Sequence, residues 1–363
     1  MAMQFAIEPN PAPASDREVA ELLAAPGFGR VFTDHMVIAQ WTAGQGWHDA
    51  ALRPYGPLTL DPATHIFHYG QSIFEGFKAY TQPDGGVATF RPYANGERFN
   101  RSAKRLALPA LDVDDFVAAA DLLVGRDRRW VPAADETSLY LRPFMMATEV
   151  GLGVRPASEV TFLLIASPAA SYFGGGAKPV SIWISEDYTR AAPGGTGAAK
   201  CGGNYAASLV AQQEAIDNGC EQVLFLDAVE RRWVEELGGM NVWVVFDDGT
   251  LATPELSGSI LEGVTRDTIL TIAGDLGHKV EERRIDVDEV RKGIESGRVT
   301  EVFACGTAAV VSSIGRLAWR DGSEAKDIAL PTQTPVAEQV RSSLVAIQHG
   351  RAPDPHGWLH RVP

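Results

Sequence analysis

The stretch Gly194-Gly-Thr-Gly-Ala-Ala-Lys-Cys-Gly-Gly-Asn-Tyr205 sets one lysine among small residues, directly before a predicted helix. Small residues let a flat ligand approach closely, and the amine of Lys200 would point into the space that they leave. A deprotonated lysine amine is the usual nucleophile for an aldehyde. An exposed lysine on a flexible loop explains the same stretch equally well. The loop is not a Walker phosphate-binding motif, because Cys201 follows the lysine where Ser or Thr is required.

A second signal is Glu236 in Val234-Glu-Glu-Leu-Gly-Gly-Met-Asn241, where an apolar strand passes into a turn. A buried carboxylate needs a cationic or protonated partner. A pyridinium nitrogen would serve, and so would any of the 25 arginines. Which of Glu235 and Glu236 is the exposed member of the pair stays open at this point.

Two segments are typical of anion-binding sites. Gly263-Val-Thr-Arg-Asp267 opens a predicted helix with a glycine and a hydroxyl, and Gly306-Thr307 follows a predicted strand. Both would present backbone N–H groups to a ligand, and Arg98 on an earlier helix could add positive charge. Together with Lys200, these features favour a phosphorylated aldehyde as cofactor.

Composition bounds the class of protein. The 363 residues suggest two domains, and 32 basic against 46 acidic residues give a net charge of −14. This charge argues against a nucleic-acid partner or an anionic membrane surface. Three cysteines without a CxxC pair favour a reducing, cytoplasmic location. We expect no signal peptide and no membrane span, and the histidines His65 and His68 lack companions for a metal site.

The order of predicted elements indicates a mixed α and β protein of two domains. We predict an N-terminal arm over residues 1–30, a small domain over 31–172, a linker over 173–187 and a large domain over 188–363. Helices are predicted from Asn95 to Leu108, from Asp112 to about Trp130, from Asn204 to about Asp217 and from Thr265 to about Leu276.

The motifs taken together resemble the class IV, or fold type IV, pyridoxal-phosphate aminotransferases. The matching segments are Gly194–Tyr205, Glu236–Asn241 and Leu261–Arg266. Further segments resemble the branched-chain amino acid aminotransferases, in the longer-chain subgroup that includes the animal enzymes: Phe67–Tyr80, Phe90–Pro92, Ser138–Pro143 and Phe303–Ala308. The matches keep their order and similar spacing from about residue 30 to residue 345. The resemblance implies an α+β fold with a smaller N-terminal α/β domain, a larger C-terminal pseudo-barrel domain and the cofactor at their interface.

The resemblance also assigns the cofactor site. Lys200 would hold pyridoxal 5'-phosphate as a Schiff base, Glu236 would pair with its pyridine nitrogen, and Tyr205 would bond its phenolic oxygen with Arg190 nearby. The phosphate cup would consist of Arg98, the backbone of Val264 and Thr265, and Thr307. The implied reaction is reversible ping-pong transamination between Leu, Ile or Val and 2-oxoglutarate, in biosynthesis or breakdown.

The implied substrate site is largely apolar. Phe74, Tyr140 and Tyr172 match the family's pocket aromatics, and Arg142 matches the residue that binds the distal carboxylate of glutamate. The backbone at Gly239 and Ala308 would receive the substrate α-carboxylate. Tyr69, Leu152 and Val154 match positions that the family supplies from a neighbouring subunit, which implies a homodimer.

Two departures and two competing hypotheses remain. Gly239 stands where the animal enzymes have a hydroxyl residue, and Ala309-Val-Val-Ser312 replaces their CxxC redox pair. A D-amino acid transaminase or aminodeoxychorismate lyase would share Lys200 and Glu236, although both are usually shorter and lack the flanking aromatic motifs. A non-catalytic or Schiff-base-only protein, such as an aldolase-like enzyme, would use Lys200 without Glu236.

Overall fold

A computed structural model describes residues 2–170 and 178–363, and the contacts between Cα atoms divide the chain into two units. The first unit comprises Met1–Tyr172, Ala199–Gly202 and Ala346–Pro363; the second comprises Phe173–Ala198 and Gly203–Val345. The predicted α+β, two-domain class is confirmed. The two segments that join the first unit lie in the range predicted as the large domain, and with them the first unit has more residues than the second, unlike the expected order of sizes.

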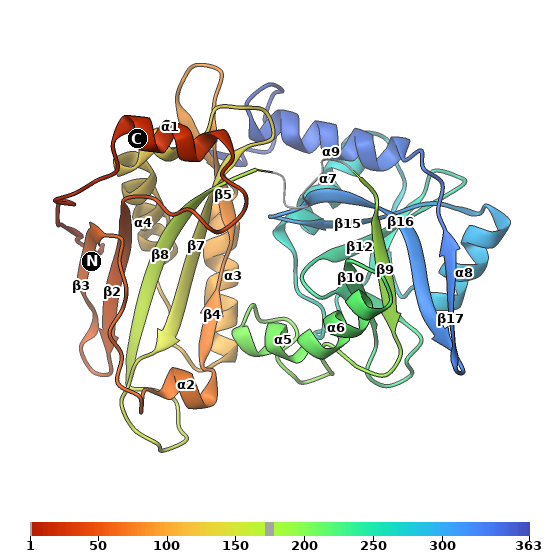
Figure 1. Ribbon diagram of the computed structural model, residues 1–363, viewed down its shortest axis with the longest axis horizontal. Helices are drawn as coiled ribbons and strands as arrows, with labels where there is room; N and C mark the ends of the chain where they lie inside the picture. The colour runs from red at the N-terminus through yellow and green to blue at the C-terminus, as the bar shows by residue number, and fades with distance from the viewer. Residues whose placement is uncertain (1, 171–177) are drawn as a thin grey trace. The chain divides into compact units, whose positions relative to one another are not determined.

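The first unit is built on one largely antiparallel sheet (Figure 1). Its elements are β1 (Ala6–Ile7), α1 (Asp16–Ala24), β2 (His35–Thr42), β3 (Gly46–Pro54), α2 (His65–Tyr69), β4 (Ser72–Phe74), β5 (Phe77–Thr81), β6 (Val87–Phe90), α3 (Pro92–Arg105), α4 (Val113–Arg126), a 3-10 turn (Arg128–Trp130), β7 (Ser138–Ala147), β8 (Glu159–Ala169) and β18 (Leu359–Arg361). The strand order is β1-β3-β2-β8-β7-β5-β6-β18, with β4 paired to β7.

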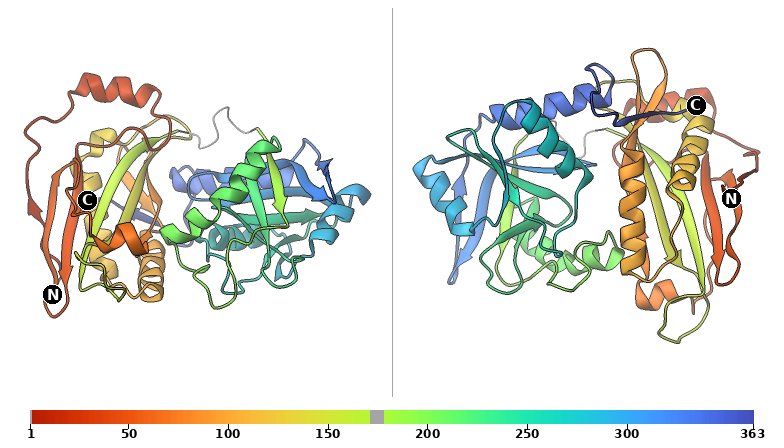
Figure 2. Two further views of the ribbon diagram at one scale, coloured as in Figure 1. Left: turned by 60° about the horizontal axis from the view of Figure 1, so that its bottom comes forward. Right: turned by 180° about the vertical axis from the view of Figure 1, so that it is seen from behind.

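Helices α3 and α4 pack together and cover one face of this sheet (Figure 2, right). The contact is aromatic: the Phe99 and Phe162 ring centres are 5.9 Å apart, and the Phe116 ring lies 5.4 Å from that of Phe99. Asp112 caps α4 as predicted, since its carboxylate accepts from the Asp114 backbone N–H over 2.9 Å. These buried rings leave the opposite face of β5 and β7 for polar and functional side chains.

The predicted N-terminal arm contains regular structure. Ala6 and Ile7 form a parallel strand on β3, and α1 begins with a capping box between Ser15 and Glu18. Val19 of this helix belongs to the hydrophobic core of the first unit. Part of the predicted arm over residues 1–30 is therefore a strand and a helix that pack on the first unit.

The second unit is built on a mixed sheet. Its elements are β9 (Val180–Ser185), α5 (Gly202–Ala207), α6 (Leu209–Asp217), β10 (Gln222–Leu226), β11 (Val234–Leu237), β12 (Asn241–Phe246), β13 (Leu251–Pro254), α7 (Val264–Asp275), β14 (Val280–Arg283), α8 (Val287–Ser296), β15 (Val299–Gly306), β16 (Val310–Asp321), β17 (Glu324–Ala329) and α9 (Pro335–Gln348). The order is β11-β10-β9-β16-β15-β12-β13-β14, with β17 paired to β16.

Both faces of this sheet are covered, which explains why its central strands are apolar throughout. In β12, Val242 and Val244 pack into one core cluster, whereas Trp243 and Val245 pack into another with residues of α7 and α9. Two boundaries differ from the prediction. Residues 180–185 of the predicted linker form β9, and the predicted helix over 204–217 is two helices, α5 and α6, that meet at Ser208.

Among residues 2–170 and 178–363, every helix falls short of the length and apolarity that crossing a lipid bilayer requires.

Candidate active site

Lys200 is anchored in the first unit. Its neighbours Ala199 and Cys201 belong to the hydrophobic core of that unit, and Cys201 forms a β-bridge with Ile73. The Lys200 backbone N–H donates to Ser102 Oγ over 2.9 Å, and its carbonyl accepts from the Phe74 N–H over 3.0 Å. The loop is therefore held on both sides, unlike the flexible loop that its glycines suggested.

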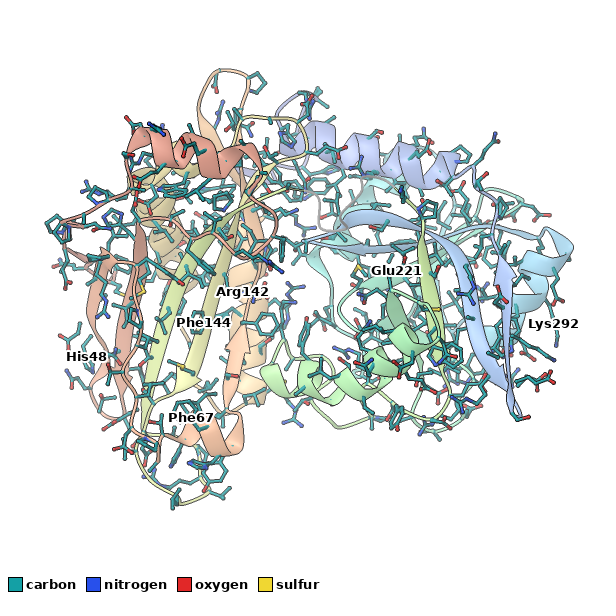
Figure 3. The ribbon with its side chains drawn as sticks, in the orientation of Figure 1. His48, Phe67, Arg142, Phe144, Glu221 and Lys292 are labelled. Carbon is teal, nitrogen blue, oxygen red and sulfur yellow. The ribbon has the colours of Figure 1, made fainter. Side chains whose placement is uncertain are left out.

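Two cations share one aromatic ring beside this anchor. Lys200 Nζ lies 4.8 Å from the centre of the Phe74 ring, and Arg142 Cζ lies 4.8 Å from the same centre. Arg142, labelled on β7 in Figure 3, also donates from Nη2 to Tyr140 Oη over 3.0 Å. Its buried Nε has no hydrogen-bond partner among the described residues. Such a group of cations over aromatic faces attracts anionic ligands.

Arg98, predicted for the phosphate cup, is oriented by a carboxylate that sequence reasoning missed. Its Nε and Nη2 donate to Glu75 over 2.7 and 2.8 Å, and both side chains are buried. Glu75 lies inside the motif Phe67–Tyr80, next to Gly76. A Cβ at Gly76 would come within 1.9 Å of Tyr140 Oη, so only glycine permits this packing. No local sequence pattern singles out Glu75, because its partner Arg98 lies 23 positions later in the chain.

In the second unit, Glu236 is buried at the end of β11 and paired. Its Oε1 lies 2.8 Å from Arg190 Nη1 and accepts from the Leu261 N–H over 2.8 Å, while Oε2 accepts from Asn241 Nδ2 over 3.3 Å. A carboxylate with a cationic partner and amide donors stays charged inside a protein. An arginine partner, which the sequence allowed as the alternative to a pyridinium nitrogen, is thus present, and Asn241 is a contact that was not predicted.

Arg190 is itself held by backbone carbonyls. It donates to the Ser259 carbonyl over 2.9 Å and to the Gly197 carbonyl over 3.4 Å. A Cβ at Gly197 would lie 2.1 Å from the Ser259 oxygen, so this approach requires a glycine. The small residues around Lys200 therefore serve the second unit as well, by allowing the Gly197 backbone to approach Ser259.

The remaining cofactor candidates of the second unit lie at turns and a helix start. Val264 and Thr265 are the first residues of α7, whose N-cap Gly263 has no side chain, and Asn241 Oδ1 occupies the position that a Cβ at Gly263 would take. Thr307 and Ala308 form the turn between β15 and β16. A helix N-terminus and such turns favour anionic groups.

Tyr205 of α5 and Gly239 are neighbours, since a Cβ at Gly239 would lie 3.5 Å from Tyr205 Cε1. Both were expected to touch cofactor or substrate. Tyr172, expected to line the substrate pocket, lies outside the described residues.

Tyr69, Leu152 and Val154 form an exposed apolar patch on the first unit. Leu152 is 68% and Val154 81% exposed. The Tyr69 hydroxyl donates to the Leu152 carbonyl over 2.5 Å, which fixes the 150–154 loop to α2. The Gly151 N–H adds a bond of 2.9 Å to the Ala63 carbonyl. The structure thus joins Tyr69 to the loop that carries the other two predicted subunit-contact residues, Leu152 and Val154.

The sequence was compared with models of known protein families. A family model described as amino-transferase class IV matches residues 72–317. The chain belongs to the class IV aminotransferases.

Relatives within this family narrow its position. The chain is 59% identical to the probable branched-chain-amino-acid aminotransferase of Streptomyces coelicolor over 98% of both chains. It is 52% identical to the branched-chain-amino-acid aminotransferase of Mycobacterium tuberculosis, over 99% of both chains. Its place in the family is therefore with the branched-chain-amino-acid aminotransferases, and it is a transaminase.

Solved structures show the same fold. The branched-chain amino acid aminotransferase of Escherichia coli aligns with a TM-score of 0.73 at 28% identity, over 90% of this chain and 99% of its own. The T.th. branched-chain amino acid aminotransferase with pyridoxamine 5'-phosphate aligns with a TM-score of 0.72 at 32% identity, over 90% and 98%. The predicted fold type IV architecture is confirmed.

Proposed function

We propose that this protein transfers the amino group of Leu, Ile and Val to 2-oxoglutarate, with pyridoxal 5'-phosphate bound at Lys200. The observation that carries the proposal is the 52–59% identity to branched-chain-amino-acid aminotransferases over nearly the whole chain. The placement of Lys200 and Glu236 in ordered, buried surroundings supports it. The reaction is reversible, so it would serve biosynthesis or breakdown.

The residues present fit this cofactor. Glu236, charged and held by Arg190 and Asn241, offers the acceptor that a protonated pyridine nitrogen needs. The start of α7 at Val264 and Thr265, with its glycine N-cap, suits a phosphate group. We assign Thr307 and Arg98 to the same phosphate and Tyr205 to the phenolic oxygen. When bound, pyridoxal phosphate supplies an electron sink that makes the substrate Cα–H acidic.

Lys200 has two roles in this proposal. Its Nζ is the amine that holds the cofactor aldehyde, and it is the base that moves a proton from the substrate Cα. The backbone bonds from Phe74 and to Ser102 fix where the side chain starts, so its reach is set before the substrate binds. A base anchored in this way loses little entropy during the proton transfer.

The substrate residues explain how one pocket accepts both leucine and glutamate. Phe74 and Tyr140, together with Tyr172, would provide apolar walls for a branched side chain. Arg142, whose guanidinium lies over both the Phe74 and the Tyr140 ring, would receive the distal carboxylate of glutamate. Because a methylene is worth only about 0.8 kcal/mol, we expect little discrimination among Leu, Ile and Val. The backbone at Gly239 and Ala308 would receive the α-carboxylate.

We also propose that the enzyme is a cytoplasmic homodimer. The patch of Tyr69, Leu152 and Val154 supports this, because ordered apolar side chains this exposed are typical of interaction surfaces. The partner subunit would cover the patch and use it to close its own substrate pocket.

A transamination panel tests the proposed function. Purified protein with added pyridoxal phosphate is assayed with L-Leu, L-Ile, L-Val, L-Phe, D-Ala and L-Glu, using 2-oxoglutarate as acceptor (for L-Glu, the 2-oxo acid of leucine). We expect turnover of the three branched-chain substrates and of glutamate, and none of D-Ala. Turnover of D-Ala in preference to L-Leu would indicate a D-amino acid transaminase and overturn the proposal.

A further inference from the structure

Strand β11 buries two consecutive carboxylic acids, and the proposed function uses only one of them. Glu236 is 2% exposed and Glu235 5% exposed. Because side chains alternate along a strand, the two carboxyl groups point to opposite faces. Burying a second carboxyl group is costly unless its contacts compensate. The contacts of Glu235 therefore indicate what it does.

Glu235 contacts the loop that precedes α7. Its Oε1 accepts a hydrogen bond from Ser259 Oγ, which lies 2.7 Å from Ser257 Oγ. Its buried Oε2 has no hydrogen-bond partner among the described residues. Glu235 also lines a cavity of about 200 Å³, whose other charged members are Asp227, Glu230, Glu255 and Arg284.

Ser259 connects this carboxyl group to the other one. Its side chain meets Glu235, and its carbonyl accepts from Arg190 Nη1 over 2.9 Å. The same nitrogen lies 2.8 Å from Glu236 Oε1. Gly197 packs closely against the Ser259 carbonyl, and Arg190 also donates to the Gly197 carbonyl, so Ser259, Gly197 and Arg190 form one packed group. Glu235 is thus connected to Glu236 through Ser259, which contacts Glu235 by its hydroxyl and Arg190 by its carbonyl, and then through Nη1 of Arg190.

We propose that Glu235 is a positioning residue. Through Ser259 it fixes Arg190 against Glu236, and so holds the Glu236 carboxylate in position for the cofactor. The proposal deepens the proposed function, and it rests on that function where it refers to the cofactor. Glu235 itself touches neither cofactor nor substrate in this account.

The surroundings of Glu235 shift its pKa, and its hydrogen bond decides which side chain can replace it. Burial raises the pKa of Glu235, the bond from Ser259 offsets this in part, and the charge of Asp227 raises it further. The positive charge of Arg190 acts in the opposite direction and does not reverse the rise. The hydrogen bond from Ser259 ends on Oε1 of Glu235, and the carbonyl oxygen of a glutamine side chain can accept the same bond. The Glu235→Gln variant should therefore keep the positioning role of Glu235, whereas Glu235→Leu, with a side chain of similar volume, should lose it.

The test measures the dissociation constant of pyridoxal phosphate by absorbance titration of the full-length, cofactor-stripped protein. For Glu235→Leu we expect a rise of about tenfold, the scale on which lost supporting contacts weaken a bound metal. For Glu235→Gln we expect a value within about twofold of the unmodified protein. Glu255→Gln, which removes a carboxylate from the same cavity, is the matched control and should change nothing.

Two outcomes overturn the proposal: a Glu235→Leu constant within about twofold of the unmodified protein, or equal weakening by glutamine and leucine. If the leucine variant does not fold, Ser259→Ala replaces it, since it removes the hydroxyl and keeps the carbonyl. The expected result is again weaker cofactor binding, and unchanged binding would contradict the linkage.

A second measurement separates this proposal from the proposed function. If the unmodified protein takes up no pyridoxal phosphate, the proposed function fails, and a double-mutant cycle in denaturant still tests the linkage. Glu235→Leu, Glu236→Gln and the double variant are compared without cofactor. We expect the double variant to lower the unfolding midpoint by less than the two single shifts together. Additive shifts would overturn the linkage.

Discussion

The backbone N–H of Phe74 donates to the carbonyl of Lys200 over 3.0 Å, and Lys200 Nζ lies 4.8 Å from the centre of the Phe74 ring. Phe74, which is 126 positions earlier in the chain, thus contacts both the backbone and the side-chain amine of Lys200. The same ring contacts Arg142. Phe74 therefore ties the proposed base to the proposed carboxylate-binding residue, and each can be tested separately.

Arg142→Gln should separate the two substrates. The variant loses the positive charge over Phe74 and Tyr140, so we expect KM for glutamate to rise about ten- to hundredfold, the value of a charged hydrogen bond. KM for leucine should change by less than about threefold, because its side chain is uncharged. Steady-state kinetics measure both, with the exposed Arg126→Gln as control. A parallel rise in both constants would remove Arg142 from the specificity account.

Gly239→Thr should restore a hydrogen bond to the substrate carboxylate. A Cβ at this position lies 3.5 Å from Tyr205 Cε1, an ordinary van der Waals contact, so the backbone has room for a first side-chain carbon. We expect KM for leucine to fall about fivefold, in line with one added hydrogen bond of about 1 kcal/mol. Gly239→Ala supplies the carbon without the hydroxyl and serves as control. An unchanged KM in the threonine variant would show that no bond is missing.

Gly197→Ala should destabilise the second unit. Its new methyl would lie 2.1 Å from the Ser259 carbonyl oxygen, which is backbone and accepts from Arg190. We expect a loss of about 3 kcal/mol in the free energy of unfolding, as for an overpacked core site. Gly274→Ala in α7 meets nothing within 4 Å and should gain up to about 1 kcal/mol. Chemical denaturation measures both, and equal stability of the two variants would contradict the packing argument.

The stability contribution of Asp227 should depend on pH. Partial burial acts to raise the pKa of Asp227, but backbone N–H groups of residues 229, 230, 232 and 233 outweigh it and lower the pKa from 3.8 to about 2. A lowered carboxyl pKa stabilises the folded state above about pH 4, and this stabilisation is lost as pH falls toward 2.

The corresponding experiment compares the unmodified protein with Asp227→Asn in denaturant at several pH values. We expect the variant to be less stable at pH 7, with the difference shrinking below pH 4. The exposed Glu295→Gln serves as control and should show no such trend. A difference that is constant down to pH 2 would contradict the assigned role of the four N–H donors.

Leu152→Asp and Val154→Asp should disrupt the proposed dimer. Each places a charge where the partner subunit would bury an apolar side chain, so we expect a monomer in sedimentation velocity. Val229→Asp alters an equally exposed apolar residue of the second unit and should leave the mass unchanged. A monomeric unmodified protein, or dimeric variants, would disprove the assignment of this patch.

The sequence predicted the elements whose signals are local. The Asp112 cap and the start of α7 after Gly263 could be predicted from the sequence, because capping residues act within one helical turn. The S-x-x-E pattern of Ser15 and Glu18 is also a local signal, but it lies among prolines and alanines that are typical of an irregular arm, and the helix that follows it was not predicted.

The features that were not predicted from the sequence depend on contacts between residues far apart in the chain. Lys200 was assigned to the large domain, yet its loop packs in the first unit through the bridge between Ile73 and Cys201, which no local pattern reveals. The burial of both Glu235 and Glu236 was also missed, because strand alternation normally exposes one of two neighbours. Both carboxyl groups are buried because both faces of this sheet are covered.

The central claim is that Lys200 carries pyridoxal phosphate, and one measurement tests it most directly. The purified protein is incubated with pyridoxal phosphate, reduced with borohydride, digested and analysed by mass spectrometry. The account predicts a phosphopyridoxyl group on the peptide that contains Lys200, and its absence in Lys200→Ala. An unmodified Lys200 peptide, or the same group on another of the chain's lysines alone, would contradict it.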